Sequence, residues 1–222
     1  MLRAIRLANF KSYGVEQSLP LAPLTVLIGA NASGKSNLLE ALQLLAWLAR
    51  GHNLADLSQA LRAGELAVRG QPSELHAGGT PLRLGCDFDE DAHLNLEVRT
   101  DGDRPRLTHE ELLTPTAQGS KLPYLYRVKE AAAARRHSVE VAYNNFARGK
   151  NKPVIECTDS QAIFTQLRTP ARFDAAHVDS QRLIPKLCDR AAELLTKTLW
   201  LSPDPRVMRG YSSTSSSDRG TT

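Results

Sequence analysis

The chain has 222 residues, of which 41% are apolar and 23% charged, so it can bury a core as one domain and is not a disordered protein overall. Its net charge of +4 permits nucleic-acid binding without requiring it. The sequence has no uncharged apolar stretch of about 18 residues and no long apolar core at its N-terminus, which argues against a transmembrane helix and a signal peptide. We therefore expect a cytoplasmic protein with no membrane partner.

The first elements along the chain are two predicted strands. Residues 2–9 alternate apolar and polar side chains, which is typical of an edge strand, and a turn follows at 11–14. Pro20 and Pro23 bracket a loop. Four of the five residues at 24–28 are apolar, and this run predicts a buried strand of a parallel sheet.

The segment that follows this strand has the spacing of a phosphate-binding loop. Residues 29–36 read Gly-Ala-Asn-Ala-Ser-Gly-Lys-Ser, which matches GxxxxGK[ST]. In such a loop glycine allows backbone N–H groups to approach a phosphate closely, and the N-terminus of the next helix adds partial positive charge. Lys35 would reach the β- and γ-phosphates and the Ser36 hydroxyl would hold Mg²⁺. The loop therefore predicts ATP and Mg²⁺ as cofactors; the alternative is a Gly/Ser-rich turn without a ligand.

Helices are predicted where apolar residues recur at helical spacing. One helix runs from the phosphate loop to about residue 50, and a second covers 54–66. Glycine and proline make 70–81 a loop. A long helix is expected over 178–199, within a helical part that covers about 160–199.

The middle of the chain has the period of β-strands. Residues 82–88 and 94–98 alternate in polarity around an acidic turn at 89–91, which predicts a hairpin. Residues 128–137 are either a short helix or a loop. The sequence therefore predicts an α/β fold: a P-loop NTPase lobe with parallel core strands and a mostly antiparallel β-rich region at about 82–157. Further strands of that region are expected at 106–113, 138–143 and 153–157.

Two segments together carry a family resemblance. Residues 5–13 read Ile-Arg-Leu-Ala-Asn-Phe-Lys-Ser-Tyr, and residues 24–42 contain the phosphate loop and end in Asn-Leu-Leu-Glu-Ala-Leu. With the β-rich stretch after them, they resemble the N-terminal lobe of AAA-family ATPases of the RecF, SMC and OLD type, which have ABC-like heads. The resemblance covers residues 1 to about 50, and residues 199–212 are loosely similar to a segment midway through that family. It implies a role in DNA repair, genome maintenance or anti-phage defence.

The resemblance also implies a nucleotide site completed by a partner. In such proteins a signature segment from another subunit closes the site, so the expected partner is a second ATPase half or a second copy of the chain. Ser36 would be the Mg²⁺ ligand, and Asn37 would offer its N–H to the α-phosphate. Lys11 and Ser12 lie where the family's first turn approaches the nucleotide. Lys11 is the implied contact, with a solvated surface lysine as the alternative. The implied nucleotide-binding residues are Gly29, Asn31, Ser33, Gly34, Lys35, Ser36, Asn37 and Lys11.

Features needed for hydrolysis are not recognisable in the sequence. No apolar run ends in Asp-Glu or Glu-Glu as a Walker B strand does, and no Ser-Gly-Gly signature loop occurs. The acidic cluster at 87–91 is interpreted as a solvated turn. Residues 212–222 contain no apolar side chain and are expected to form a disordered Ser/Thr-rich tail after a lobe that spans 1–211. One hypothesis is a truncated ATPase with an incomplete fold.

Several readings of function therefore stay open. The first is an ATPase that hydrolyses ATP only when a partner or a missing half completes it. The alternatives are a catalytically inactive nucleotide-binding interaction module and a P-loop kinase. A basic segment near three tyrosines, Tyr124, Tyr126 and Tyr143, could contact DNA or form a solvated face. Its members are Arg127, Lys129, Arg135, Arg136, Arg148, Lys150 and Lys152. The three cysteines, Cys86, Cys157 and Cys188, are predicted to be small buried residues.

Overall fold

The computed structural model describes residues 1–76, 80–89, 91–100, 104–115, 124–129, 137–149 and 151–201. The strands are β1 (Leu2–Ala8), β2 (Gln17–Pro20), β3 (Leu82–Phe88), β4 (Ala92–Arg99), β5 (Arg106–Leu113), β6 (Tyr124–Val128), β7 (Ser138–Tyr143) and β8 (Val154–Thr158). The helices are α1 (Lys35–Ala49), α2 (Leu57–Ala63), α3 (Ile163–Gln166) and α4 (Val178–Lys197). Short 3₁₀ turns cover Leu54–Asp56, Pro72–Glu74 and Pro170–Arg172. The fold is therefore of the α/β class, as predicted.

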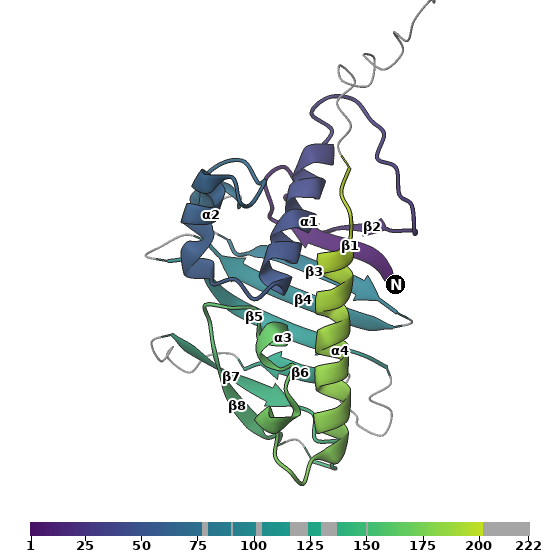
Figure 1. Cartoon of the computed structure of the whole chain (residues 1–222), viewed down its shortest axis with the longest axis vertical. Coiled ribbons are helices and arrows are strands. Elements are labelled where there is room, and N and C mark those ends of the chain that lie inside the picture. The colour runs from purple at the N-terminus through teal and green to yellow at the C-terminus, as the bar shows by residue number, and fades with distance from the viewer. Residues whose placement is uncertain are drawn as a thin grey trace, which may run out of the picture.

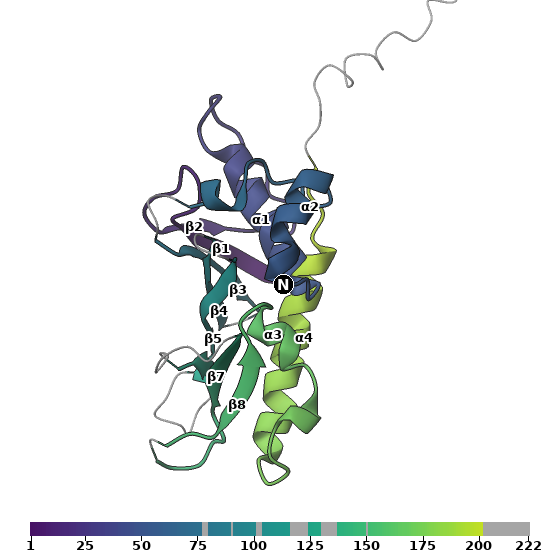
Figure 2. The ribbon, with the colours of Figure 1, turned by 90° about the vertical axis from the view of Figure 1, so that its left-hand side faces the viewer.

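All eight strands form one sheet, in the order β2-β1-β3-β4-β5-β6-β7-β8. Every neighbouring pair is antiparallel. Figures 1 and 2 show the four helices on one face of this sheet, where α1 and α4 contact each other. The sheet therefore has one face covered by helices and one face bearing mostly polar side chains.

The alternation of side chains explains why the strands form and which face they bury. Along β4 every second residue is buried, so Leu94, Leu96 and Val98 point toward the helices while Asn95 and Glu97 point away. The same core includes the inward leucines of α1 and the apolar stripe of α4. Burial of these side chains is the main source of stability for the sheet and the helices.

The predicted strand at 24–28 is not formed, and this corrects the expectation of parallel core strands. Leu24, Val26 and Ile28 are 82%, 69% and 90% exposed, and the segment is irregular. Figure 1 shows it arching away from the sheet between β2 and α1. A buried parallel strand needs neighbouring strands to satisfy its backbone and cover its side chains. In the described part of the chain the sheet ends at β2, and no strand is parallel to another.

The other observed elements agree to different degrees with those predicted from the sequence. The β3–β4 hairpin, β5, β7, β8 and the long helix α4 confirm their predictions. The predicted second helix begins as a 3₁₀ turn, where the Asn53 side chain accepts a hydrogen bond from the Ala55 N–H, and it ends earlier, at Gly64. β2 was not predicted, and β6 and α3 were not predicted individually, although they lie in the parts expected to be β-rich and helical. Residues 130–136 and 202–222 lie outside the described part, so the tail and the division of the chain at 211 stay predictions.

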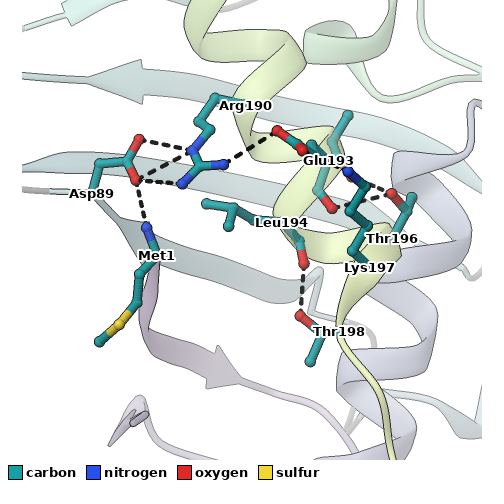
Figure 3. Close-up of polar contacts among 9 residues, drawn as sticks. Met1, Asp89, Arg190, Glu193, Leu194, Thr196, Lys197 and Thr198 are labelled. Carbon is teal, nitrogen blue, oxygen red and sulfur yellow. Dashed lines mark hydrogen bonds and ion pairs between the residues drawn. The ribbon is translucent and has the colours of Figure 1, made fainter. Parts of the chain in front are cut away.

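A polar cluster joins the N-terminus, the β3–β4 turn and α4. Asp89 accepts a hydrogen bond from the Met1 ammonium at 2.5 Å and further bonds from the Arg190 guanidinium (Figure 3). Burial acts to raise the pKa of Asp89, but Arg190 and the ammonium outweigh it and lower that pKa. These contacts fasten the second half of α4 to the start of the chain.

Within the described residues, no helix is both long and apolar enough to cross a membrane.

Candidate nucleotide-binding site

The candidate site is the loop between residue 28 and α1. Gly34 is the N-cap of α1 with φ 91°, and Ala32 also has a positive φ of 64°. Gly34 therefore occupies a left-handed conformation that glycine adopts without strain. Gly29, Asn31 and Ser33 are exposed. The first turn of α1 contains no acidic residue, and no side chain caps it, so its partial positive charge faces an open loop.

Lys35 folds back over its own loop. Its Nζ atom donates to the carbonyl oxygens of Gly29 at 2.7 Å and Ala30 at 2.6 Å, and to the Ser33 hydroxyl at 3.2 Å. The Lys35 ammonium therefore lies inside the curve of the loop, where only neutral oxygen atoms accept its hydrogen bonds. A phosphate group supplies a charged acceptor, which forms stronger hydrogen bonds with an ammonium than a carbonyl does. The loop residues thus fit the phosphate chain of a nucleotide, and Ser36, exposed on the first turn of α1, fits a Mg²⁺ ligand.

The turn after β1 contacts the loop from a second direction. Tyr13 donates from its hydroxyl to the Gly34 carbonyl at 3.3 Å, and Asn37 donates from its side-chain amide to the Ser12 hydroxyl at 2.8 Å. The Asn37 side chain is therefore engaged by the turn, so a contact with the α-phosphate falls to its backbone N–H. Burial raises the pKa of Tyr13, so the phenol stays protonated and remains a donor at neutral pH.

Lys11 lies in a cluster of charges beside α1. Its ammonium pairs with Glu40, a glutamate of α1 that is only 5% exposed, and also donates to the Arg69 carbonyl at 2.7 Å. Arg69 donates from Nε to the other oxygen of Glu40 at 2.5 Å. A nucleotide contact by Lys11 would require it to leave Glu40. That contact stays a prediction, while the observed role of Lys11 is to hold the turn against α1.

Seven of the eight predicted residues thus lie in one loop and the first turn of α1, whereas Lys11 contacts α1 at Glu40. Sequence reasoning missed the residues that brace the loop. Glu40 gave one signal, since it is a charged residue among the leucines of a helix that is otherwise mostly buried. The missed residues are Tyr13, Glu40 and Arg69.

The acidic cluster is not a candidate for water activation. Asp87 pairs with Arg6 at 2.7 Å and with His93, and Asp89 belongs to the cluster at the N-terminus. The turn is where the sequence placed it, but Asp87 and Asp89 are engaged in ion pairs, whereas Asp91 is exposed as expected of a solvated turn. Glu90 lies outside the described residues.

In its described residues, the basic segment lacks most of the exposed tyrosines that stacking with DNA would require, and two of its cations are in ion pairs. Tyr126 and Tyr143 are 0% and 2% exposed, so they cannot stack with bases, which corrects that part of the reading. Arg127 pairs with Glu111, and Lys129 pairs with Glu140. Arg135, Arg136 and Lys150 lie outside the described residues. The cysteines are free and buried, as predicted.

Comparisons with known proteins agree with a phosphate-binding loop at residues 29–36. Residues 24–123 match the family model described as AAA domain, putative AbiEii toxin, Type IV TA system. A DNA replication and repair protein RecF from Gloeobacter violaceus is 42% identical over 84 residues, which cover 38% of this chain and 20% of that protein. The RecF protein of Picosynechococcus sp. is 35% identical over 118 residues, which cover 53% of this chain and 27% of that protein. No solved structure is significantly similar to the chain.

The extent of these matches limits what they imply. The RecF protein of Thermosynechococcus vestitus is 35% identical over 106 residues, or 28% of its length. The chain thus matches between about a fifth and 28% of these relatives, and most of their length has no counterpart in the matched part. The match to the family model includes the phosphate loop described above. Together the family model and the relatives show that the N-terminal region of this chain is similar to ATPases of the AAA/RecF type.

Proposed function

We propose that the chain binds ATP with Mg²⁺ at the loop formed by residues 29–36, as part of an ATPase that acts in DNA repair or genome maintenance. The observation that carries this proposal is the geometry of Lys35. Its ammonium is held inside the loop by neutral carbonyls, beside an uncapped helix N-terminus with no acidic residue in its first turn. Similarity to RecF proteins supports the DNA-related role, whereas anti-phage defence and a cytoplasmic location rest on the sequence alone.

The residues of the site contact different parts of the nucleotide and the metal. Lys35 and the loop N–H groups hold the β- and γ-phosphates, and the Asn37 N–H holds the α-phosphate. Ser36 is the Mg²⁺ ligand, and the metal, when bound, neutralises charge on the phosphates. No carboxylate of the described residues lies in the loop to activate water, so hydrolysis needs a second ATPase half or a second copy of the chain.

Replacing Lys35 by alanine is expected to weaken Mg-ATP binding about 10- to 100-fold, because a charged hydrogen-bond donor to phosphate contributes about 1.5–3 kcal/mol. Isothermal titration of wild type and Lys35→Ala measures the difference. Lys186→Ala is the matched control, since it removes the same charge from the exposed side of α4. Equal affinities of wild type and Lys35→Ala would contradict the proposed site.

The same samples separate the functional classes. Wild type that binds Mg-ATP without turnover agrees with a lobe that a partner completes, or with a catalytically inactive interaction module. Phosphate release by the chain alone, abolished in Lys35→Ala, would show that the chain is a complete enzyme and that no second half is needed. Phosphate transfer to a small-molecule acceptor would instead favour the P-loop kinase.

The exposed segment at 24–28 supports a missing partner. Its side chains Leu24, Val26 and Ile28 alternate, are largely exposed and directly precede the loop. Contiguous exposed apolar side chains mark an interaction surface or an aggregation liability. We infer that the second ATPase half places strands against this segment, since the matched relatives are several times longer than the part they share with this chain.

The double substitution Val26→Asp and Ile28→Asp is expected to reduce self-association of the purified chain, because it places charges on an exposed apolar segment. Size-exclusion chromatography and binding of an apolar dye measure the change. Stability is expected to change by less than about 1 kcal/mol, as both side chains are exposed. The control is Val15→Asp, an equally apolar residue that is 73% exposed in another turn. A monodisperse wild type that binds no dye would refute the inference.

A further inference from the structure

The turn at residues 9–14 is fixed to the core. Phe10, which is fully buried, exchanges backbone hydrogen bonds with Tyr13 at 3.1 and 2.8 Å. The Lys11 N–H donates to the Leu75 carbonyl at 3.0 Å. The Lys11 ammonium is held by Glu40 of α1. The turn is thus anchored to the sheet, to the segment around residue 75 and to α1, so it provides a firm platform for the side chain of Tyr13.

Tyr13 packs against the N-cap of α1. Two of its ring carbons lie 3.3 and 3.4 Å from the position that a Cβ atom would take at Gly34, and the hydroxyl oxygen lies 3.0 Å from that position. The Gly34 carbonyl that accepts from the Tyr13 hydroxyl also accepts from the Leu38 N–H at 2.9 Å, in the first hydrogen bond of the helix. Tyr13 therefore contacts the residue whose left-handed conformation turns the loop into the helix.

We propose that Tyr13 is a positioning residue, which holds Gly34 so that the loop and the first turn of α1 keep their N–H groups aimed at phosphate. This inference rests on the proposed ATP binding. In the described structure Lys35 braces the loop through Gly29, Ala30 and Ser33, and those bonds are given up when the ammonium turns to a phosphate. The contact of Tyr13 with Gly34 does not involve Lys35. It remains as the brace of a loop whose own residues are exposed.

The ring and the hydroxyl contribute unequally. The hydroxyl bond of 3.3 Å is at the long end of the range, and the Gly34 carbonyl keeps its helical partner without it. The ring, in contrast, fills the space beside Gly34, and its removal takes away the atoms nearest to that residue on this side. Tyr13→Phe is therefore expected to bind Mg-ATP within about threefold of wild type, and Tyr13→Ala about tenfold more weakly.

The experiment has two readouts. The first is the affinity for Mg-ATP of wild type, Tyr13→Phe and Tyr13→Ala, with Tyr124→Ala in β6 as the control tyrosine. The second is amide hydrogen exchange of residues 29–37 in the nucleotide-free protein, where Tyr13→Ala is expected to exchange about tenfold faster while β4 is unchanged. If Tyr13→Ala does not fold, Tyr13→Leu takes its place with the same expected effects.

The outcomes distinguish this inference from the proposed function. Wild-type affinity and loop exchange in both the alanine and leucine variants would overturn the positioning role while leaving ATP binding intact. Loss of affinity that Phe does not rescue, together with faster exchange throughout the sheet, would show a general structural role and also overturn it. A wild type that does not bind Mg-ATP would refute the proposed function, and the loop exchange would still decide whether Tyr13 holds the loop.

Discussion

Replacing Glu110 by alanine is expected to lower the free energy of unfolding by about 4 kcal/mol at pH 5. Glu110 is fully buried in β5 and accepts three hydrogen bonds. They come from the Tyr126 hydroxyl at 2.6 Å and from the backbone N–H groups of Ile163 at 2.7 Å and Phe164 at 2.6 Å. Alanine leaves these buried donors without their acceptor, each at a cost of about 1–3 kcal/mol. Urea unfolding of wild type and Glu110→Ala measures the loss.

The effect depends on pH in a direction that the structure sets. Burial raises the pKa of Glu110 from 4.5 to about 7, against the opposing effect of Tyr126 and the two N–H groups. Between these pH values the folded chain holds a proton that the unfolded chain releases, so the stability from this group is full below about pH 4.5 and is lost as pH rises through about 7. The cost of Glu110→Ala should therefore be about 2–3 kcal/mol smaller at pH 8 than at pH 5.

A nearby surface carboxylate provides the control for Glu110. Glu156 of β8 is exposed, and Glu156→Ala should change stability by less than about 0.5 kcal/mol. A cost for Glu110→Ala no larger than that of Glu156→Ala would contradict the account of how β5 holds α3. A cost that grows from pH 5 to pH 8 would contradict the raised pKa.

Replacing Glu40 by glutamine is expected to lower the free energy of unfolding by about 3 kcal/mol. The Glu40 side chain is 7% exposed and the Lys11 side chain 13%, so the substitution leaves a largely buried ammonium without its counter-charge. Arg69, the other partner, is 70% exposed and regains water when the pair is broken. Thermal and urea unfolding of Glu40→Gln test this expectation. The control is Arg69→Ala, which should cost less than about 1 kcal/mol; equal losses in the two variants would contradict it.

Local signals predicted much of the site and part of the fold. The phosphate loop and α1 follow from the spacing of Gly29, Gly34 and Lys35, because all the groups that bind phosphate in such a loop are neighbours in the sequence. The hairpin of β3 and β4 follows from strict alternation. By contrast, β6 buries four of its five residues and so lacks alternation, and β2 is short and mostly exposed.

The remaining errors concern contacts between distant segments. The apolar run at 24–28 predicted burial, but whether a parallel strand forms depends on neighbours that the described sheet does not supply. Lys11, Glu40 and Arg69 meet only when β1, α1 and the loop before Leu75 are folded together. No spacing in the sequence indicates that meeting. Tyr13 likewise stands in the sequence only as part of a family motif, because its contact with Gly34 joins residues that are 21 positions apart.

The most direct test of ATP binding at the loop is amide hydrogen exchange with and without Mg-ATP. We expect added nucleotide to slow exchange at residues 29–37, where the N–H groups gain phosphate acceptors, and to leave the outer strands β7 and β8 unchanged. In Lys35→Ala the protection should be reduced or absent at the same nucleotide concentration. Exchange at 29–37 that Mg-ATP does not alter, or protection that appears only elsewhere in the chain, would contradict the central claim.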